Sequence, residues 1–97
     1  MESSNRLAGQ VAWISGATSG IGEATARLFG REGAAVAIVG RRLALARRIA
    51  REINAAGGRA LALACDVSSE QQVKVSIERT VERFGKLDIL VNNAGLV

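Results

Sequence analysis

The sequence has 97 residues, of which 48% are apolar and 23% charged, and 13 basic residues against 9 acidic ones give a net charge of +4. This composition is typical of a globular chain and argues against a disordered, collagen-like or membrane-embedded one. Because the chain has no histidine and no tyrosine, it cannot form a Ser-His-Asp triad, a histidine metal site or a tyrosine acid.

The single cysteine and the first residues predict a cytoplasmic protein. Cys65 has no partner for an intrachain disulfide, which favours a reducing compartment, and we expect it to be a small buried apolar residue. No apolar run reaches the ~18 residues of a membrane span. The segment 1–6 lacks the basic-then-apolar order of a signal peptide.

Apolar runs and amphipathic segments alternate along the chain. Residues 10–15 form a nearly continuous apolar run, typical of a strand that is buried on both faces. A helix is expected from Gly20, and Gly33 offers it a left-handed stop. Its expected core-facing residues recur at helical spacing: Ile21, Ala24, Thr25, Leu28 and Phe29.

The same alternation continues to the end of the sequence. Further strands are predicted over residues 35–39, 60–65 and 87–91. The second helix is marked by Leu45, Ile49, Ile53 and Ala56, and the third by Val73, Ile77, Thr80, Val81 and Phe84. Arginines 47, 48 and 51 fall mostly on the other face of the second helix, where Arg48 and Glu52 form an i,i+4 pair. Ser69 and Gln72 predict a capping box for the third helix.

This order predicts a βαβαβαβ chain, which is a doubly wound α/β fold with a parallel sheet. Right-handed crossovers then favour the strand order 3-2-1-4. Ligands bind such sheets at the carboxyl ends of the strands, beside the point where the strand order reverses. We therefore expect Gly16 and Asn93 to lie at the ligand site, and residues 1–97 to form one unit.

The most informative motif is the glycine-rich turn between the first strand and the first helix. Residues 15–22 read S-G-A-T-S-G-I-G, in which bare backbone can approach a pyrophosphate and the helix can offer free N–H groups. A tight turn without a ligand would also use these glycines. The turn is no P-loop, because Glu23 follows Gly22, and its spacing is not G-x-G-x-x-G.

With D-I-L-V-N-N-A-G some seventy residues later, this turn resembles the start of a short-chain dehydrogenase/reductase. Those enzymes carry T-G-x-x-x-G-x-G and N-N-A-G at these places. The segments 7–11 and 65–67 are also similar to the family, and the resemblance extends from about Leu7 to Gly95. One departure is Ser15, where the family usually has threonine.

The resemblance implies a binding site for a nicotinamide dinucleotide. The residues implied at the pyrophosphate and riboses are Gly16, Thr18, Ser19, Gly20, Ile21 and Gly22. Asp66 would bind the adenine amino group beside the Val67 N–H, or alternatively cap the next helix. Backbone of Asn93, Ala94 and Gly95 would lie near the ribose, and Asn92 would tie the central strands together.

The end of the second strand favours NADP(H) over NAD(H). NAD-selective sites place an acid there, ~20 residues after the glycines, to bind the ribose 2′-hydroxyl. This sequence has Gly40, Arg41 and Arg42 instead, and two guanidinium groups suit a 2′-phosphate. A basic residue that some NADP enzymes of the family carry before the second glycine is missing, because Ser19 stands there.

The family's chain is more than twice this long, so the resemblance implies the N-terminal, NADP(H)-binding portion of an oxidoreductase. Its catalytic serine and Tyr-x-x-x-Lys pair would follow Val97, so no catalytic residue is expected here and the portion alone should be inactive. The full-length enzyme would transfer hydride to or from a small carbonyl or alcohol substrate, as a homo-oligomer without membrane or nucleic-acid partners.

Two alternatives remain open. The first is a non-catalytic dinucleotide-binding sensor with the same fold. The second is a basic nucleic-acid module, which one tryptophan and two phenylalanines equip poorly for base stacking.

Overall fold

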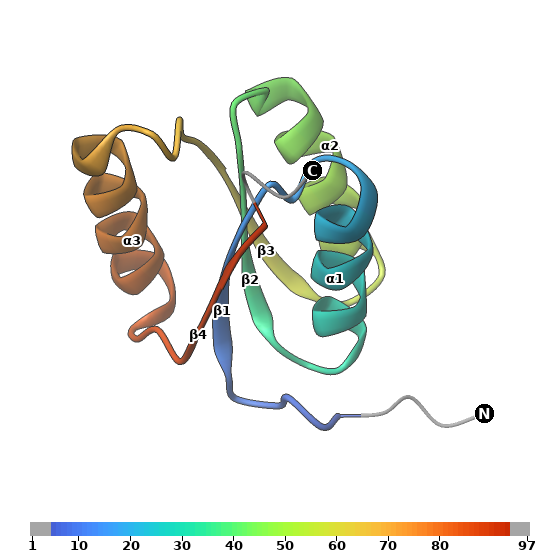
Figure 1. Ribbon diagram of the computed structural model, residues 1–97. Helices are drawn as coiled ribbons and strands as arrows, with labels where there is room; N and C mark the ends of the chain where they lie inside the picture. The colour runs from blue at the N-terminus through green and yellow to red at the C-terminus, as the bar shows by residue number, and fades with distance from the viewer. Residues whose placement is uncertain (1–4, 94–97) are drawn as a thin grey trace.

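The computed structural model describes residues 5–93 as strands and helices that alternate around one parallel sheet (Figure 1). The elements are β1 (Val11–Ser15), α1 (Gly20–Arg31), β2 (Ala35–Gly40), α2 (Leu43–Ala55), β3 (Arg59–Ala64), α3 (Glu70–Phe84) and β4 (Ile89–Asn92). The sheet order is β3-β2-β1-β4, and each neighbouring pair is parallel. The predicted doubly wound α/β fold and strand order 3-2-1-4 are confirmed.

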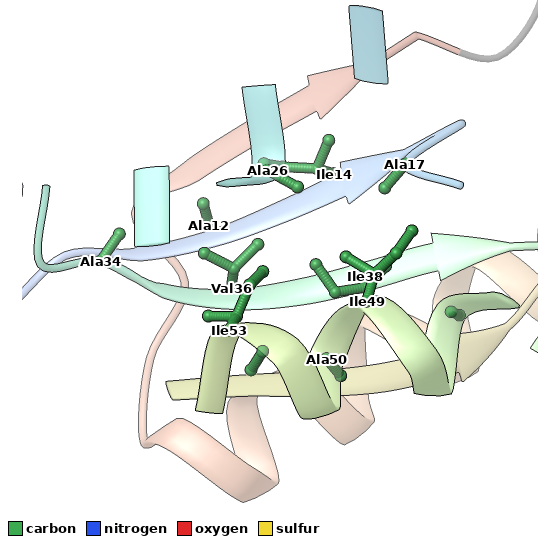
Figure 2. Packing of buried hydrophobic residues seen from close by; sticks show 12 residues of the cluster. Ala12, Ile14, Ala17, Ala26, Ala34, Val36, Ile38, Ile49, Ala50 and Ile53 are labelled. Carbon is green, nitrogen blue, oxygen red and sulfur yellow. The ribbon is translucent and has the colours of Figure 1, made fainter. Parts of the chain in front are cut away.

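Helices cover both faces of the sheet, which explains why the strands are continuously apolar. α1 and α2 lie on one face and α3 on the other (Figure 1). On the first face, Val36 and Ile38 belong to the same buried cluster as Ile49 and Ile53 of α2 (Figure 2). The cluster on the α3 face contains Trp13, Ala37, Val39, Leu63 and Cys65. Every residue of β1 and β2 is buried as a result.

The strand ends differ by one or two residues from the predicted ones. Gly40, expected just past the second strand, is the last residue of β2 and pairs with Ala64. β4 runs from Ile89 to Asn92, so Asn92 pairs with Ser15 of β1. Register against the neighbouring strand, and not apolar character alone, decides where each ladder stops.

The predicted core face of α1 is wrong for most of its residues, although Phe29 packs against the buried cluster as expected. Ile21 is 73% exposed and Leu28 is 45% exposed. The buried residues of α1 are Gly22, Ala26 and Gly30, which follow one another at intervals of four. A Cβ on Gly30 would lie 3.0 Å from Ile53 Cγ2, so α1 and α2 approach closely. Small residues mark this face because the neighbouring elements leave no room for large ones.

The predicted core face of α3 is confirmed at Val73, Ile77 and Thr80, and the buried Ser76 adds to it a residue that was not expected. Ser76 and Thr80 are its buried residues, whereas Val81 is exposed. The indole Nε1 of Trp13 donates a hydrogen bond of 2.9 Å to Ser76 Oγ. A buried indole N–H requires an acceptor, which explains a serine at this core position.

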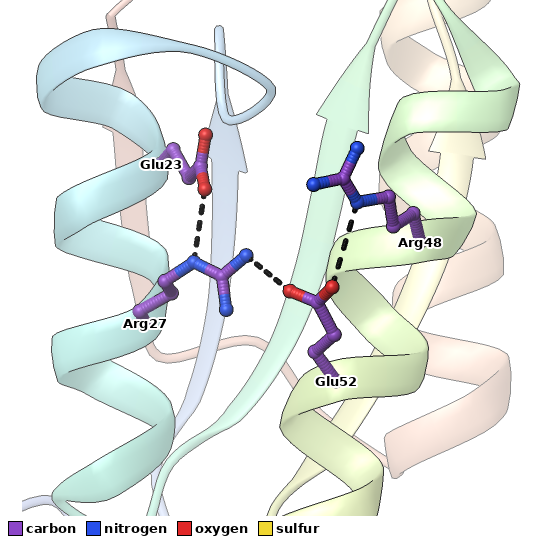
Figure 3. Close-up of polar contacts among 4 residues, drawn as sticks. All are labelled: Glu23, Arg27, Arg48 and Glu52. Carbon is purple, nitrogen blue, oxygen red and sulfur yellow. Dashed lines mark hydrogen bonds and ion pairs between the residues drawn. The ribbon is translucent and has the colours of Figure 1, made fainter.

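The polar face of α2 joins it to α1 through a chain of ion pairs (Figure 3). Arg27 of α1 contacts Glu23 at 3.0 Å and Glu52 of α2 at 2.6 Å. The predicted Arg48–Glu52 pair is present at 3.5 Å. Hydrogen bonding from Arg27 lowers the pKa of the Glu52 carboxyl below its ordinary value. Arginines 47, 48 and 51 are exposed, as expected for a solvated helix face.

The capping box predicted at the start of α3 is half correct. Ser69 Oγ accepts a hydrogen bond from the Gln72 backbone N–H at 3.2 Å. The Gln72 side chain does not return to Ser69. Its Oε1 accepts from the backbone N–H of Asp66 at 2.8 Å, so it fixes the loop that precedes the helix.

Within residues 5–93, no helix has the length and apolar character that crossing a bilayer requires.

Asp88, which directly precedes β4, connects the starts of β1 and β4. Its Oδ2 accepts a 2.8 Å hydrogen bond from the Val11 N–H, and its own N–H donates to the Val11 carbonyl at 2.9 Å. The hydrogen bond from Val11 lowers the pKa of the Asp88 carboxyl below its ordinary value, and Lys86 adds to the effect. A carboxyl with a lowered pKa in the folded state stabilises the fold above its unfolded-state pKa.

We predict that the stability contributed by Asp88 is lost as the pH falls below about 4, through the folded pKa. Asp88→Asn should remove part of the acid-induced drop in melting temperature, because it cannot titrate, yet it keeps an acceptor for Val11. Asp88→Ala should be the less stable variant at pH 7, because it leaves the Val11 N–H unpaired. Thermal melts of the purified proteins from pH 7 to pH 2 measure both effects. Identical pH profiles for wild type and Asp88→Asn would contradict the prediction.

Candidate functional site

A groove of about 660 Å³ lies at the carboxyl ends of the strands. Its lining comes from the β1–α1 turn, the end of β2, the β3–α3 loop and the end of β4: Gly16, Thr18, Gly40, Arg41, Arg42, Cys65, Asp66, Val67, Ser68 and Asn92. Ser15 and the groove-lining Asn92 join the ends of β1 and β4 through an Oγ–Oδ1 hydrogen bond of 2.6 Å. The hydroxyl that Ser15 shares with threonine therefore makes a structural contact.

The glycine-rich turn depends on backbone that has no side chains. Gly16 and Gly20 have φ values of +61° and +57°, which other residues rarely adopt. A Cβ on Gly22 would overlap the carbonyl oxygen of Gly16, so the first turn of α1 lies directly against the end of β1. The Ser19 side chain makes no capping hydrogen bond to α1. The first N–H groups of the helix therefore receive no acceptor from the side chain of their cap residue.

The other predicted residues of the turn lie on two sides of it. Thr18 is half-buried and lines the groove. Ser19, Gly20 and Ile21 are exposed at the beginning of α1 and are not part of the groove lining. The structure therefore brings Gly16 and Thr18 to the groove and leaves Ser19, Gly20 and Ile21 beside its mouth.

The end of β2 contributes positive charge and no carboxylate. Arg41 and Arg42 follow Gly40 and are both exposed. Arg41 Nη2 lies 3.5 Å from Asp66 Oδ1, and its side chain remains 76% exposed. Ion pairs exposed to this degree contribute little to stability, so the Arg41 guanidinium is free to exchange partners.

Asp66 uses one of its carboxylate oxygens for hydrogen bonds within its own loop. Its Oδ1 accepts hydrogen bonds from the Ser68 hydroxyl at 2.7 Å and from the Ser68 N–H at 3.0 Å. These bonds, the hydroxyl first, lower the pKa of the Asp66 carboxyl, and Arg41 adds to them. Asp66 therefore closes a turn before α3, while Ser69 is the capping residue. The D-x-S spacing of Asp66 and Ser68 is the sequence signal for this turn, and our sequence analysis missed it.

The remaining predicted residues lie at the ends of β3 and β4. Cys65 is buried, as expected, and its N–H donates to the Gly40 carbonyl at 3.0 Å. Val67 lines the groove. Asn93 follows β4, and its Nδ2 is shielded from solvent without a hydrogen-bond partner among residues 5–93. Ala94 and Gly95 lie outside the described residues.

Carboxylates and the lone cysteine do not gather into a metal site in the described part of the chain. No group of three or more His, Cys, Asp or Glu side chains there could hold an ion. The groove instead combines glycine backbone, hydroxyl groups and arginines, and these are the groups that bind phosphates.

A family model described as short chain dehydrogenase matches residues 10–97. The chain belongs to the short-chain dehydrogenase/reductase family. The family's glycine-rich motif follows β1, and its N-N-A-G motif begins at the end of β4. These two strands are neighbours in the sheet, so the motifs start side by side.

Named members of the family are similar to this short-chain dehydrogenase/reductase chain along most of its length. Mitochondrial borneol dehydrogenase from Lavandula x intermedia is 44% identical over 91 residues, which are 94% of this chain and 33% of the relative. Tropinone reductase-like 2 from Erythroxylum coca is 44% identical over 92 residues, or 95% of this chain and 32% of the relative. The chain therefore spans about a third of these relatives.

Solved structures give the same result for the fold. A hydroxysteroid dehydrogenase from Escherichia coli aligns with a TM-score of 0.90 and 41% identity, covering 93% of this chain and 38% of that one. A short chain dehydrogenase from Mycobacterium smegmatis aligns with a TM-score of 0.90 and 39% identity, covering 99% and 40%.

We predict that Gly22→Ala abolishes dinucleotide binding. The added methyl group overlaps the Gly16 carbonyl, so the turn has to move away from the start of α1. Gly57→Ala is the matched control, because its φ is +95° and nothing lies within 4 Å of the added Cβ. We expect this control to lower stability but to bind as wild type does. Titration with NADPH, followed by nucleotide fluorescence, measures both variants. Wild-type affinity in Gly22→Ala would mean that the turn is only structural.

Proposed function

We propose that this chain is the NADP(H)-binding part of an oxidoreductase that transfers hydride between a nicotinamide and a carbonyl or alcohol carbon. The dehydrogenases and reductases among its relatives support this reading over a non-catalytic sensor. The enzyme's substrates would be small molecules. A cytoplasmic location and a homo-oligomeric full-length enzyme remain predictions.

The observation that carries the proposal is the meeting of the glycine turn with the end of β2 in one groove. Gly16 lies at one wall and Arg41 at another. A pyrophosphate held by the turn and the start of α1 would then have its adenosine ribose toward β2. The residues present fit a dinucleotide, because the Gly16–Gly22 contact excludes a Cβ and the Ser19 side chain leaves the helix N–H groups uncapped.

The charge at the end of β2 supports NADP(H) over NAD(H). Gly40 supplies no carboxylate to accept a ribose 2′-hydroxyl or to repel a 2′-phosphate. Arg41 and Arg42 are exposed beside it, and the 3.5 Å contact of Arg41 with Asp66 can give way to a phosphate.

We assign the β3–α3 loop to adenine and the segment that follows β4 to the second ribose. Asp66 would accept from the adenine amino group through its remaining acceptor capacity, with the Val67 N–H beside it. The backbone of Asn93 would face the ribose, whereas Ala94 and Gly95, which the family motif also assigns to it, lie outside the described residues. A buried donor without an acceptor costs about 1–3 kcal/mol. An acceptor brought near the unpaired Nδ2 of Asn93 would remove that cost.

The chain's own contribution to hydride transfer is binding and orientation. A bound nicotinamide supplies the carbon that gives or takes the hydride. None of the 97 residues is a tyrosine or histidine that could transfer the accompanying proton near neutral pH. We therefore assign the proton donor to residues outside this sequence.

We predict that Arg41→Ala weakens NADPH binding about 10- to 100-fold, because a charge-assisted contact of roughly 1.5–3 kcal/mol is lost. NADH binding should stay within about twofold, since NADH has no 2′-phosphate for this arginine to hold. Arg51→Ala, an exposed arginine of α2 outside the groove lining, is the control for net charge. Calorimetric titration of each purified protein measures both dinucleotides. Equal losses for NADPH and NADH would refute the 2′-phosphate role.

We also predict that the 97 residues alone reduce no carbonyl compound above background. The reason is the missing proton donor, so the expectation holds even where NADPH binds. The measurement is the decrease in NADPH absorbance in the presence of a panel of ketones and aldehydes. An intact short-chain dehydrogenase is the positive control. Turnover by the isolated chain would show that the proton donor lies within it.

A further inference from the structure

Gly40 stands at the point where an acid would decide cofactor choice, yet its backbone does not require glycine. The glycines with positive φ are Gly9, Gly16, Gly20, Gly33, Gly57 and Gly85, and Gly40 is not among them. Any L-residue could adopt its conformation. The requirement for glycine must therefore come from the space around it.

Thr18 occupies that space. A Cβ built on Gly40 would lie 2.8 Å from Thr18 Cγ2 and 3.2 Å from Thr18 Oγ1. Real Cβ atoms essentially never come within 3.0 Å of another heavy atom, so a side chain at position 40 would force a shift. Threonine is branched at Cβ and stiff about χ1. Exchanging its methyl and hydroxyl groups by rotation would leave one branch against Gly40.

Both residues also line the groove that Arg41 and Asp66 border. The Gly40 carbonyl accepts from the Cys65 N–H, so β2 is tied to the β3–α3 loop and cannot easily move away from Thr18. With β2 held in this way, relief of an overlap has to come from the side chain at position 18.

We propose that Thr18 is a specificity-determining residue that acts through position 40, a proposal that rests on the NADP(H)-binding function proposed above. Its two branches fill the space that an acidic side chain at the end of β2 would need. The end of β2 is thereby kept without a carboxylate of its own, and the space beside Arg41 stays open to a 2′-phosphate that can displace Asp66. A change of cofactor preference at this site therefore requires substitutions at both positions.

The steric part of the proposal is tested without nucleotide. Gly40→Ala adds only the Cβ, and Thr18→Ala removes both branches while keeping a Cβ that lies 3.6 Å from it, an ordinary contact. In thermal melts of the purified proteins, Gly40→Ala should be destabilising, and much less so when Thr18→Ala is also present. Thr18→Val has the shape of threonine without the hydroxyl, so it should not relieve Gly40→Ala. If the changes in melting temperature of Thr18→Ala and Gly40→Ala simply add in the double variant, the two positions are not coupled and the proposal is overturned.

The specificity part is tested with Gly40→Asp. Alone, Gly40→Asp should lower the affinity for both NADPH and NADH. Making room for the aspartate displaces Thr18, and with it the glycine-rich turn that is proposed to bind the pyrophosphate of either dinucleotide. Combined with Thr18→Ala, it should recover NADH binding and shift the NADH-to-NADPH preference by about tenfold or more, the scale of one charge-assisted contact. Combined with Thr18→Val, it should recover nothing.

The outcomes separate this proposal from the one on which it rests. Wild type that binds NADPH, together with a Thr18→Ala, Gly40→Asp variant no better at binding NADH than Gly40→Asp alone, overturns the role of Thr18 only. Wild type that binds neither dinucleotide overturns the proposed function, and the specificity role with it, whatever the melting curves show.

Discussion

The close approach of α1 to the end of β1 is the constraint on which the rest of this structure depends. Gly22 lies against the Gly16 carbonyl with no room for a side chain between them. α1 is therefore held near the sheet along its length, and Ala26 and Gly30 continue its small-residue face. The helix begins directly beside the groove for the same reason. A larger residue at this contact would move the helix and open the site.

The architecture could be predicted from the sequence because its signals are local. Continuous apolar runs and helical spacing distinguish strands from helices, and parallel crossovers with a fixed hand leave few topologies. The buried face of α1 could not be predicted in this way. Apolar patterning favours Ile21 and Leu28 for that face, whereas Gly22 and Gly30 form it by letting neighbours approach. The serine that satisfies Trp13 likewise carries no apolar signal.

In the candidate site too, some features could be predicted from the sequence and others could not. The glycine turn, Arg41 and Asp66 stand out by residue type and by their positions at strand ends. The structure brings the arginine and the aspartate to one groove with the first part of the turn, Gly16 and Thr18. Contacts between distant segments leave no such trace. The packing of Thr18 on Gly40 and the pairing of Arg41 with Asp66 depend on distances that only the folded sheet sets. Sequence patterns thus identify groups that line the groove, but not the constraints those groups place on one another.

The strand order also sets a sequence of events for folding. β1 pairs with β2 on one side and with β4 on the other, and Asp88 is 77 residues from its partner Val11. Loop closure over this distance adds little to the entropic cost but slows the search, as in other folds with high contact order. During synthesis, β1, β2 and β3 leave the ribosome well before β4. One edge of β1, which is apolar except for Ser15, is then open to pairing with other chains, and this interval is when the nascent protein is most exposed to aggregation.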